Sequence, residues 1–256
     1  MKDEIRAELF KLEEEHPIHI VNARERGSRM LGVVHDGSDY DVMFLFAQDA
    51  AQYAKLDGHI DSIHDPERGD NGLIDLHGWN IDKFAQLAAD SNPNAVEYCR
   101  PDAKEYITHH DVGAFDAVCR ELRENFNHMS LYYHYISMAK SNYKKYVESG
   151  KECTINRQFH VARALACAKH IRKDGTLPPM NVDALLNYGS LNEPLARLLE
   201  ELAVEKRAGH VDDEIGDFVG GYYSAESEVP VEPTDERISQ PDRSVIDDFI
   251  GLSVVR

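Results

Sequence analysis

Two carboxylates one residue apart, Asp39 and Asp41, precede an apolar run in the stretch GSRMLGVVHDGSDYDVMFLF, which begins at Gly27. Alternate residues of a β-strand point to the same face of a sheet, so a strand here would project both carboxylates together. Two like charges this close either share a proton or bind a cation. Mg²⁺ prefers oxygen ligands and takes one or two protein carboxylates together with substrate phosphates. The pair therefore predicts a divalent-cation site.

A third carboxylate, Asp75, lies within the apolar stretch GLIDLHGWN. An unpaired carboxylate in the middle of an apolar strand is costly to bury, so a functional role for it is favoured. Asp75 is the best candidate to complete a two-metal cluster with Asp39 and Asp41.

Gly27 and Ser28 fit the same chemistry. A glycine between a strand and a helix lets the backbone approach a ligand closely, and the N–H groups that follow favour phosphate. Together these residues predict nucleotidyl transfer, in which Gly27 and Ser28 hold a triphosphate and Asp75 helps a second Mg²⁺ or Mn²⁺ ion to activate an attacking hydroxyl. The alternative is a surface turn rich in Gly, Ser and Asp that leads into an ordinary strand.

The elements that must position these residues follow from the hydrophobic periodicity. Apolar residues at Ile5, Leu9 and Leu12 predict an amphipathic helix over 2–15. Asn80 is a plausible N-cap for a helix over 80–90. The patterns also predict strands over 17–23, 39–46, 53–64 and 72–80 and a short helix over 92–99.

From about residue 110 the pattern becomes helical, with few strand signals. We therefore expect an α+β fold, in which a small mixed β-sheet domain flanked by helices precedes an all-α domain. The expected boundaries are a catalytic domain over 1–108, a helical domain over 109–222, and an acidic linker with a short C-terminal tail over 223–256.

The composition narrows the functional classes. A net charge of −18 should repel nucleic acid at long range. Alternatively, it indicates a protein that functions in high salt, where charges are screened within about 3 Å at 1 M. We favour a halophilic host. The four cysteines match no zinc spacing and are expected to be reduced thiols. No stretch is long and apolar enough to span a membrane, and no secretory signal is present, so a cytoplasmic protein is expected.

The motif resembles that of the DNA polymerase beta-type nucleotidyltransferase superfamily, and within it the RNA-repair-associated branch of RlaP/YcgL-like proteins. The branch motif runs GSR, two residues, Gly, a short spacer and SDYDV. This chain carries it as Gly27, Ser28, Arg29, Gly32, Ser38, Asp39, Tyr40, Asp41 and Val42. A second stretch, IDLHGWNIDKFAQLAADSNPNAVEY, is similar to the strand, helix and Ser-Asn-Pro segment of the branch.

The resemblance implies transfer of a nucleoside monophosphate from an NTP such as ATP, with Asp39, Asp41 and Asp75 as metal ligands and catalytic residues. It also implies a helical domain that closes over the nucleotide. An RNA 3′ end is the acceptor that fits best. The alternatives are a protein acceptor, as in antitoxin-type adenylyltransferases, and a catalytically silent module that binds metal or nucleotide.

Other residues leave two interpretations open. Arg29 could contact phosphate or pair with Asp39. Lys140 and Tyr143, in a helical segment rich in Lys and Tyr, could hold the triphosphate and stack on the base, or they could form a core stripe with a solvated edge. Arg163 and His170 match a loose ribonuclease pattern that is common by chance. The predicted nucleotide contacts are Gly27, Ser28, Arg29, Ser38, Lys140 and Tyr143.

Overall fold

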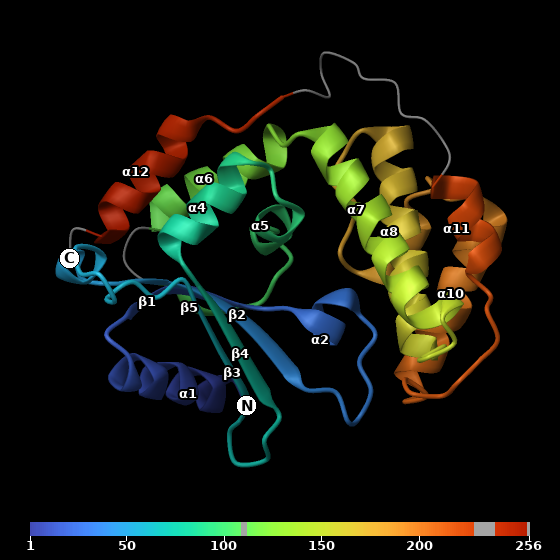
Figure 1. Cartoon of the computed structure of the whole chain (residues 1–256), viewed down its shortest axis with the longest axis horizontal. Helices are drawn as coiled ribbons and strands as arrows, with labels where there is room; N and C mark the ends of the chain where they lie inside the picture. The colour runs from blue at the N-terminus through green and yellow to red at the C-terminus, as the bar shows by residue number, and fades with distance from the viewer. Residues whose placement is uncertain (109–111, 228–238, 255–256) are drawn as a thin grey trace. The chain divides into compact units, whose positions relative to one another are not determined.

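The computed structural model describes residues 1–108, 112–227 and 239–254 (Figure 1). The chain divides into two compact units. The sheet unit comprises Met1–Met30, Ser38–Phe126 and Gln240–Arg256, and the helical unit comprises Leu31–Gly37 and Asn127–Ser239. Residues 228–238 of the expected linker lie outside the described residues.

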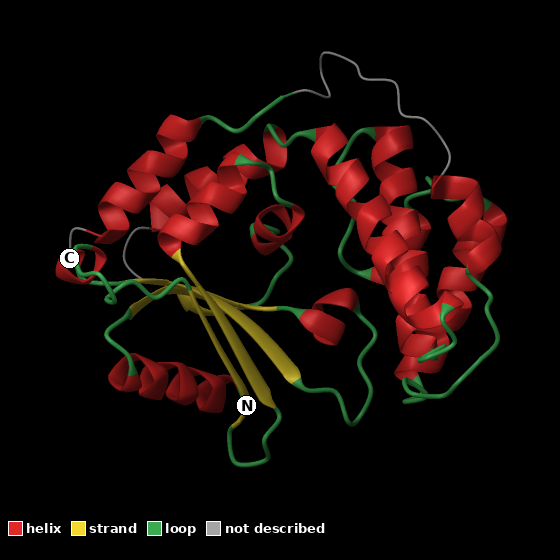
Figure 2. Cartoon of the chain, viewed as in Figure 1, coloured by secondary structure: helices red, strands yellow, loops and turns green. Residues whose placement is uncertain are grey.

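The sheet unit contains a five-stranded mixed sheet with the order β3-β4-β2-β1-β5. Figure 2 shows its strands in yellow among the red helices. β2 and β4 are parallel, and the other neighbours are antiparallel. The expected mixed α+β fold is confirmed. The strands are β1 (His19–Glu25), β2 (Tyr40–Ala47), β3 (Ser62–Arg68), β4 (Ile74–Asn80) and β5 (Glu105–Thr108).

Two sequence predictions about strands were inexact. The strand predicted over 53–64 begins only at Ser62, because the short helix α3 (Ala50–Tyr53) is followed by turns and irregular backbone over 54–61. The edge strand β5 was not predicted, since four residues carry too little periodicity to be recognised.

The central strand β2 is apolar on both faces because both faces of the sheet are covered. On one face, Ile5, Leu9 and Leu12 of α1 (Lys2–Glu15) are fully buried, as the amphipathic pattern predicted. The opposite face is covered by helices from three parts of the chain (Figure 1). These helices are α4 (Ile81–Ala89), α5 (Pro93–Tyr98), α6 (Val112–Glu124) and α12 (Arg243–Val254).

Aromatic side chains join these covering helices. Phe249 of α12 packs edge-on against Phe84 of α4, with ring centroids 6.0 Å apart at 81°, and lies 5.8 Å from Phe115 of α6. Such edge-to-face pairs contribute about 0.5–1.5 kcal/mol beyond the burial of their area. The C-terminal helix is therefore an integral part of the sheet unit.

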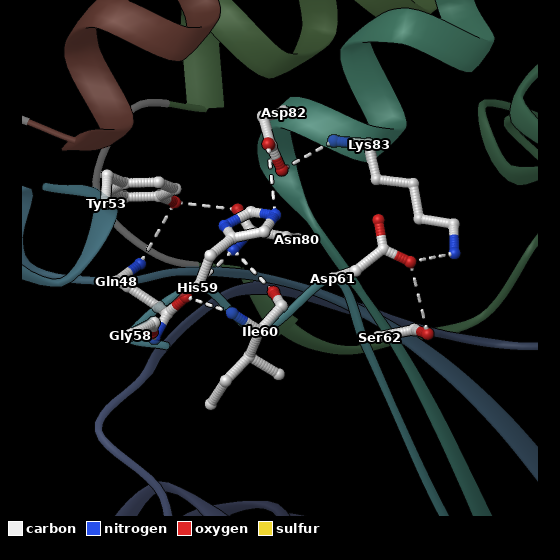
Figure 3. Close-up of polar contacts among 10 residues, drawn as sticks. All are labelled: Gln48, Tyr53, Gly58, His59, Ile60, Asp61, Ser62, Asn80, Asp82 and Lys83. Carbon is white, nitrogen blue, oxygen red and sulfur yellow. Dashed lines mark hydrogen bonds and ion pairs between the residues drawn. The ribbon is translucent and has the colours of Figure 1, made fainter. Parts of the chain in front are cut away.

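Asn80 occupies the N-cap position of α4, but its side chain makes no capping hydrogen bond. It is fully buried and instead joins two loops (Figure 3). Its Nδ2 donates to Gln48 Oε1 at 3.3 Å and to the Ile60 carbonyl at 2.8 Å, and its Oδ1 accepts from the Tyr53 hydroxyl at 2.7 Å. Asn80 therefore occupies the predicted N-cap position, but its side chain satisfies buried polar groups of the neighbouring loops and does not cap the helix.

The described part of the helical unit is built around α8 (Ile155–Asp174), most of whose residues are buried, including the polar Gln158, Arg163 and His170. The Thr154 side chain caps its start, and Gly175, with φ of 64°, ends it in a left-handed turn. Arg163 and His170 are both buried within this helix, which leaves the ribonuclease pattern as a packing feature. The surrounding helices are α7 (His128–Asn142), the π-helix η1 (Tyr143–Glu148), α9 (Val182–Asn187), α10 (Glu193–Arg207) and α11 (Gly220–Ser227).

All four cysteines are free, as predicted. None of the described helices is both long and apolar enough to cross a membrane.

His160 gives the helical unit a dependence on pH. Burial, together with the charges of Lys206, Arg163 and Arg157, lowers the pKa of His160 from 6.5 to about 3. Between these values the unfolded chain binds a proton that the folded chain does not, so stability falls as the pH drops from about 6.5 toward 3. We expect His160→Gln to lose less unfolding free energy than the wild type between pH 7 and pH 5 in urea titrations. Parallel losses in the two proteins would contradict this.

Candidate functional site

Gly27 connects β1 to the short helix α2 (Gly27–Leu31) and is required there for two reasons. Its φ of +63° is in the left-handed region, which favours glycine. A Cβ atom at this position would overlap the Asp41 carboxylate. The glycine backbone therefore lies directly against the carboxylate.

Asp41 and Asp75 are the second residues of β2 and β4, and they are register partners across this parallel pair. Neighbouring strands lie about 4.8 Å apart and paired residues point to the same face, so the two carboxylates project side by side. With Gly27 they line a pocket of about 260 Å³ at the amino ends of both strands. The other lining residues are Arg26, Val42, Met43 and His77.

Asp39 was expected to share a strand with Asp41, but β2 begins at Tyr40, so Asp39 lies just before the strand. The backbone around it is held by Arg29, whose Nε donates to the Asp39 carbonyl at 3.1 Å and whose Nη2 donates to the Ser38 carbonyl at 3.2 Å. The Arg29 guanidinium also lies 3.5 Å from the centre of the Tyr40 ring. Arg29 thus fixes the turn that leads into the carboxylate strand.

The carboxylates at the pocket form a pair and not a larger cluster. Within residues 1–108, 112–227 and 239–254, no three His, Cys, Asp or Glu side chains gather closely enough to do so. The two that the structure does bring together, Asp41 and Asp75, match the one or two protein carboxylates that Mg²⁺ normally takes. The pair fits such an ion, with the remaining ligands left to substrate and water.

The other predicted nucleotide contacts are distributed over both units. Ser28 follows Gly27 in α2 and is half-buried, and Ser38 is buried just before β2. Lys140 is exposed in the last turn of α7, within the helical unit. Tyr143 follows in the π-helix, where its hydroxyl donates to Asp217 Oδ2 at 2.8 Å.

Side chains of the helical unit contact both the ring and the hydroxyl of Tyr143. Its ring stacks on that of Tyr223 with centroids 4.7 Å apart. Partial burial and the hydrogen bond to Asp217 raise the pKa of Tyr143 to about 12. The phenol therefore stays protonated at neutral pH and serves as a donor.

Several site residues were missed in the sequence analysis. His64 of β3 contacts Asp75, with Nε2 3.0 Å from Oδ1. Arg26 lines the pocket, and its backbone N–H donates to the Asp41 carbonyl at 2.8 Å. The Arg26 guanidinium lies 3.8 Å from the Glu97 carboxylate. Arg26 directly precedes the Gly-Ser motif, which is the signal that could have identified it, whereas His64 reaches Asp75 only through strand pairing.

His77 also lines the pocket, as its position two residues after Asp75 in β4 requires. Desolvation, together with the charges of His64 and Arg26, lowers the pKa of the His77 imidazole. Trp79, two residues further along, is buried in the core.

The sequence matches the family "RlaP: RNA repair pathway DNA polymerase beta family" over residues 1–250. The chain belongs to this family. It is also 34% identical over 210 residues to a Bacillus subtilis (strain 168) protein, "Uncharacterized protein YcgL", and the match covers 82% of this chain and 78% of that protein. The resemblance inferred from the GSR and SDYDV motifs is therefore confirmed.

A solved nucleotidyltransferase-like protein from Exiguobacterium sibiricum 255-15 is similar over 100% of this chain and 93% of its own. At 15% identity and a TM-score of 0.35, this likeness is too low to carry an argument. Membership of the RlaP family indicates a polymerase beta-type nucleotidyltransferase with an NTP substrate.

Proposed function

We propose that this RlaP-family protein transfers a nucleoside monophosphate from an NTP to an acceptor hydroxyl in a Mg²⁺- or Mn²⁺-dependent reaction. The observation that supports this best is the pairing of Asp41 with Asp75 at the pocket, with the Gly27 backbone directly against Asp41. A side chain at Gly27 would overlap that carboxylate, so the glycine makes room for the Asp41 side chain at the pocket.

In the proposed reaction, the acceptor oxygen bonds to the α-phosphorus, and the bond from that phosphorus to the bridging oxygen of pyrophosphate breaks. Pyrophosphate leaves, and the hydroxyl proton passes to Asp75 or to water. Gly27 and Ser28 bind the triphosphate through backbone N–H groups and the serine hydroxyl. Arg29 and Ser38 support the same side of the site through the turn before β2.

The metal would be held by Asp41 and Asp75, whereas Asp39, before the start of β2, remains a predicted ligand that the structure does not bring into a group of three with them. When bound, it would neutralise the phosphate charge and favour ionisation of the attacking hydroxyl. The residues themselves supply a fixed, negatively charged edge on two hydrogen-bonded strands, so little reorganisation is needed to receive a cation. Lys140 and Tyr143 remain predicted nucleotide contacts.

An RNA 3′ end is the acceptor we propose, because the family is described as part of an RNA repair pathway. The net charge of −18 favours a second candidate, a protein acceptor, since an acidic surface repels RNA at low ionic strength. The two candidates differ in their salt dependence. Screening at high salt should help RNA approach an acidic protein.

The test is incubation of the purified protein with each α-labelled NTP, an RNA with a free 3′ hydroxyl, and Mg²⁺ or Mn²⁺ at low and high salt. We expect label on the RNA and stoichiometric release of pyrophosphate. An RNA with a blocked 3′ end is the matched control. Label on protein would favour the second candidate, and metal-dependent binding of NTP without turnover would overturn enzymatic activity in favour of a silent module.

A further inference from the structure

His64 lies on the strand beside the one that carries Asp75, and that strand holds no residue of the GSR and SDYDV motifs. It belongs to β3, the edge strand next to β4, and pairs with His77 of β4 in antiparallel register. Its side chain reaches diagonally across the strand pair to Asp75, with Nε2 3.0 Å from Oδ1. An ionised carboxylate only accepts hydrogen bonds, so this contact requires the imidazole proton on Nε2.

We propose that His64 is a positioning residue for Asp75, which fixes that carboxylate beside Asp41 in the orientation that receives a divalent cation. This inference rests on the proposed function. The imidazole engages one oxygen, Oδ1, and leaves Oδ2 of the same carboxylate for a ligand. A carboxylate held in this way loses less conformational freedom when it binds a cation.

The His64 ring is itself constrained. It lies against the His77 ring, with centroids 5.5 Å apart at 51°. His77 is in turn packed edge-on against Trp79, at 6.2 Å and 76°. This row of rings runs from Asp75 toward the buried Trp79, so the exposed His64 ring rests against neighbouring side chains on one side.

The chain offers a matched comparison in His19. Its Nε2 lies 3.3 Å from Asp49 Oδ1 in a similar exposed pair, and its side chain is 64% exposed against 59% for His64. Exposed ion pairs of this kind contribute little to stability. Loss of either histidine should therefore have a small effect on folding, whereas only loss of His64 should affect the carboxylate site.

The experiment titrates Mn²⁺ alone into five full-length proteins and follows the free ion by electron paramagnetic resonance. The proteins are the wild type, His64→Ala, His64→Gln, His19→Ala and Asp41→Asn. We expect His64→Ala to bind Mn²⁺ about 10–100-fold more weakly, which is the typical cost of removing the hydrogen-bond partner of a metal ligand. His64→Gln should restore most of the affinity, because its amide nitrogen can donate from the same place, and His19→Ala should bind as the wild type does.

Two outcomes would overturn the proposal: wild-type affinity in His64→Ala, or an equal loss in His19→Ala. The wild type and Asp41→Asn binding Mn²⁺ equally weakly would instead overturn the metal site of the proposed function. In the nucleotidyl-transfer assay, His64→Ala should lower kcat with little change in the KM for NTP. Weaker Mn²⁺ binding by His64→Ala, together with no transfer by the wild type, would retain the positioning role and reject the enzyme.

Discussion

Replacing Asp41 with asparagine is expected to lower nucleotidyl transfer by about 10³-fold or more while the protein stays folded. The change keeps the size of the side chain and removes its charge, which is the property that a divalent cation and its phosphates require. A loss of this size corresponds to about 4 kcal/mol of transition-state stabilisation. Because Asp41 and Asp75 are adjacent like charges, the variant should also melt at the same temperature as the wild type or slightly above it.

The measurement is the initial rate of transfer from an α-labelled NTP, together with a thermal melt of each protein. Asp49→Asn is the matched control, because Asp49 is an exposed carboxylate outside the pocket. Near wild-type transfer by Asp41→Asn would remove the paired carboxylates from the mechanism. A large drop in melting temperature would assign Asp41 a structural role.

Gly27→Ala should have the second largest effect, because it combines two costs. An alanine at φ of +63° is strained by about 1 kcal/mol relative to glycine. Its Cβ would also overlap the Asp41 carboxylate, so the carboxylate or the strand connection must move. A shift of about 1 Å in a catalytic group can cost about 10²-fold in rate, so we expect at least that loss of transfer together with a lower melting temperature.

Gly150→Ala separates the two costs. Gly150 has nearly the same φ, +65°, but a Cβ there would have no neighbouring atom within 4 Å. Both variants should therefore show the conformational cost in their melting temperatures, and only Gly27→Ala should lose activity and Mn²⁺ affinity. Equal activities in the two variants would mean that contact between Gly27 and Asp41 is unimportant for function.

Much of the site could be predicted because its parts lie in local patterns. The apolar stretches around Asp41 and Asp75 identified both strands, and the Gly-Ser motif identified the connection at Gly27. The exact start of β2 could not be predicted, since strand boundaries depend on hydrogen bonds to neighbouring strands. This is why Asp39 was expected within the strand and lies before it.

What the sequence could not provide depends on contacts between distant residues. Arg24, a buried cation in β1, donates to Glu105 and to the carbonyls of Tyr98 and Arg100, more than 70 positions away. The contact between His64 and Asp75 likewise needs the register of β3 against β4. No periodicity in a single segment contains that information.

The central claim is that Asp41 and Asp75 receive a divalent cation together with an NTP, and anomalous diffraction from a crystal tests it most directly. Crystals of the full chain soaked with Mn²⁺ and a non-hydrolysable NTP should give an anomalous peak about 2.0–2.3 Å from oxygens of both carboxylates, in contact with the triphosphate and next to the Gly27 backbone. A bound triphosphate with no anomalous peak between Asp41 and Asp75, or with its metal held by other residues, would contradict the account.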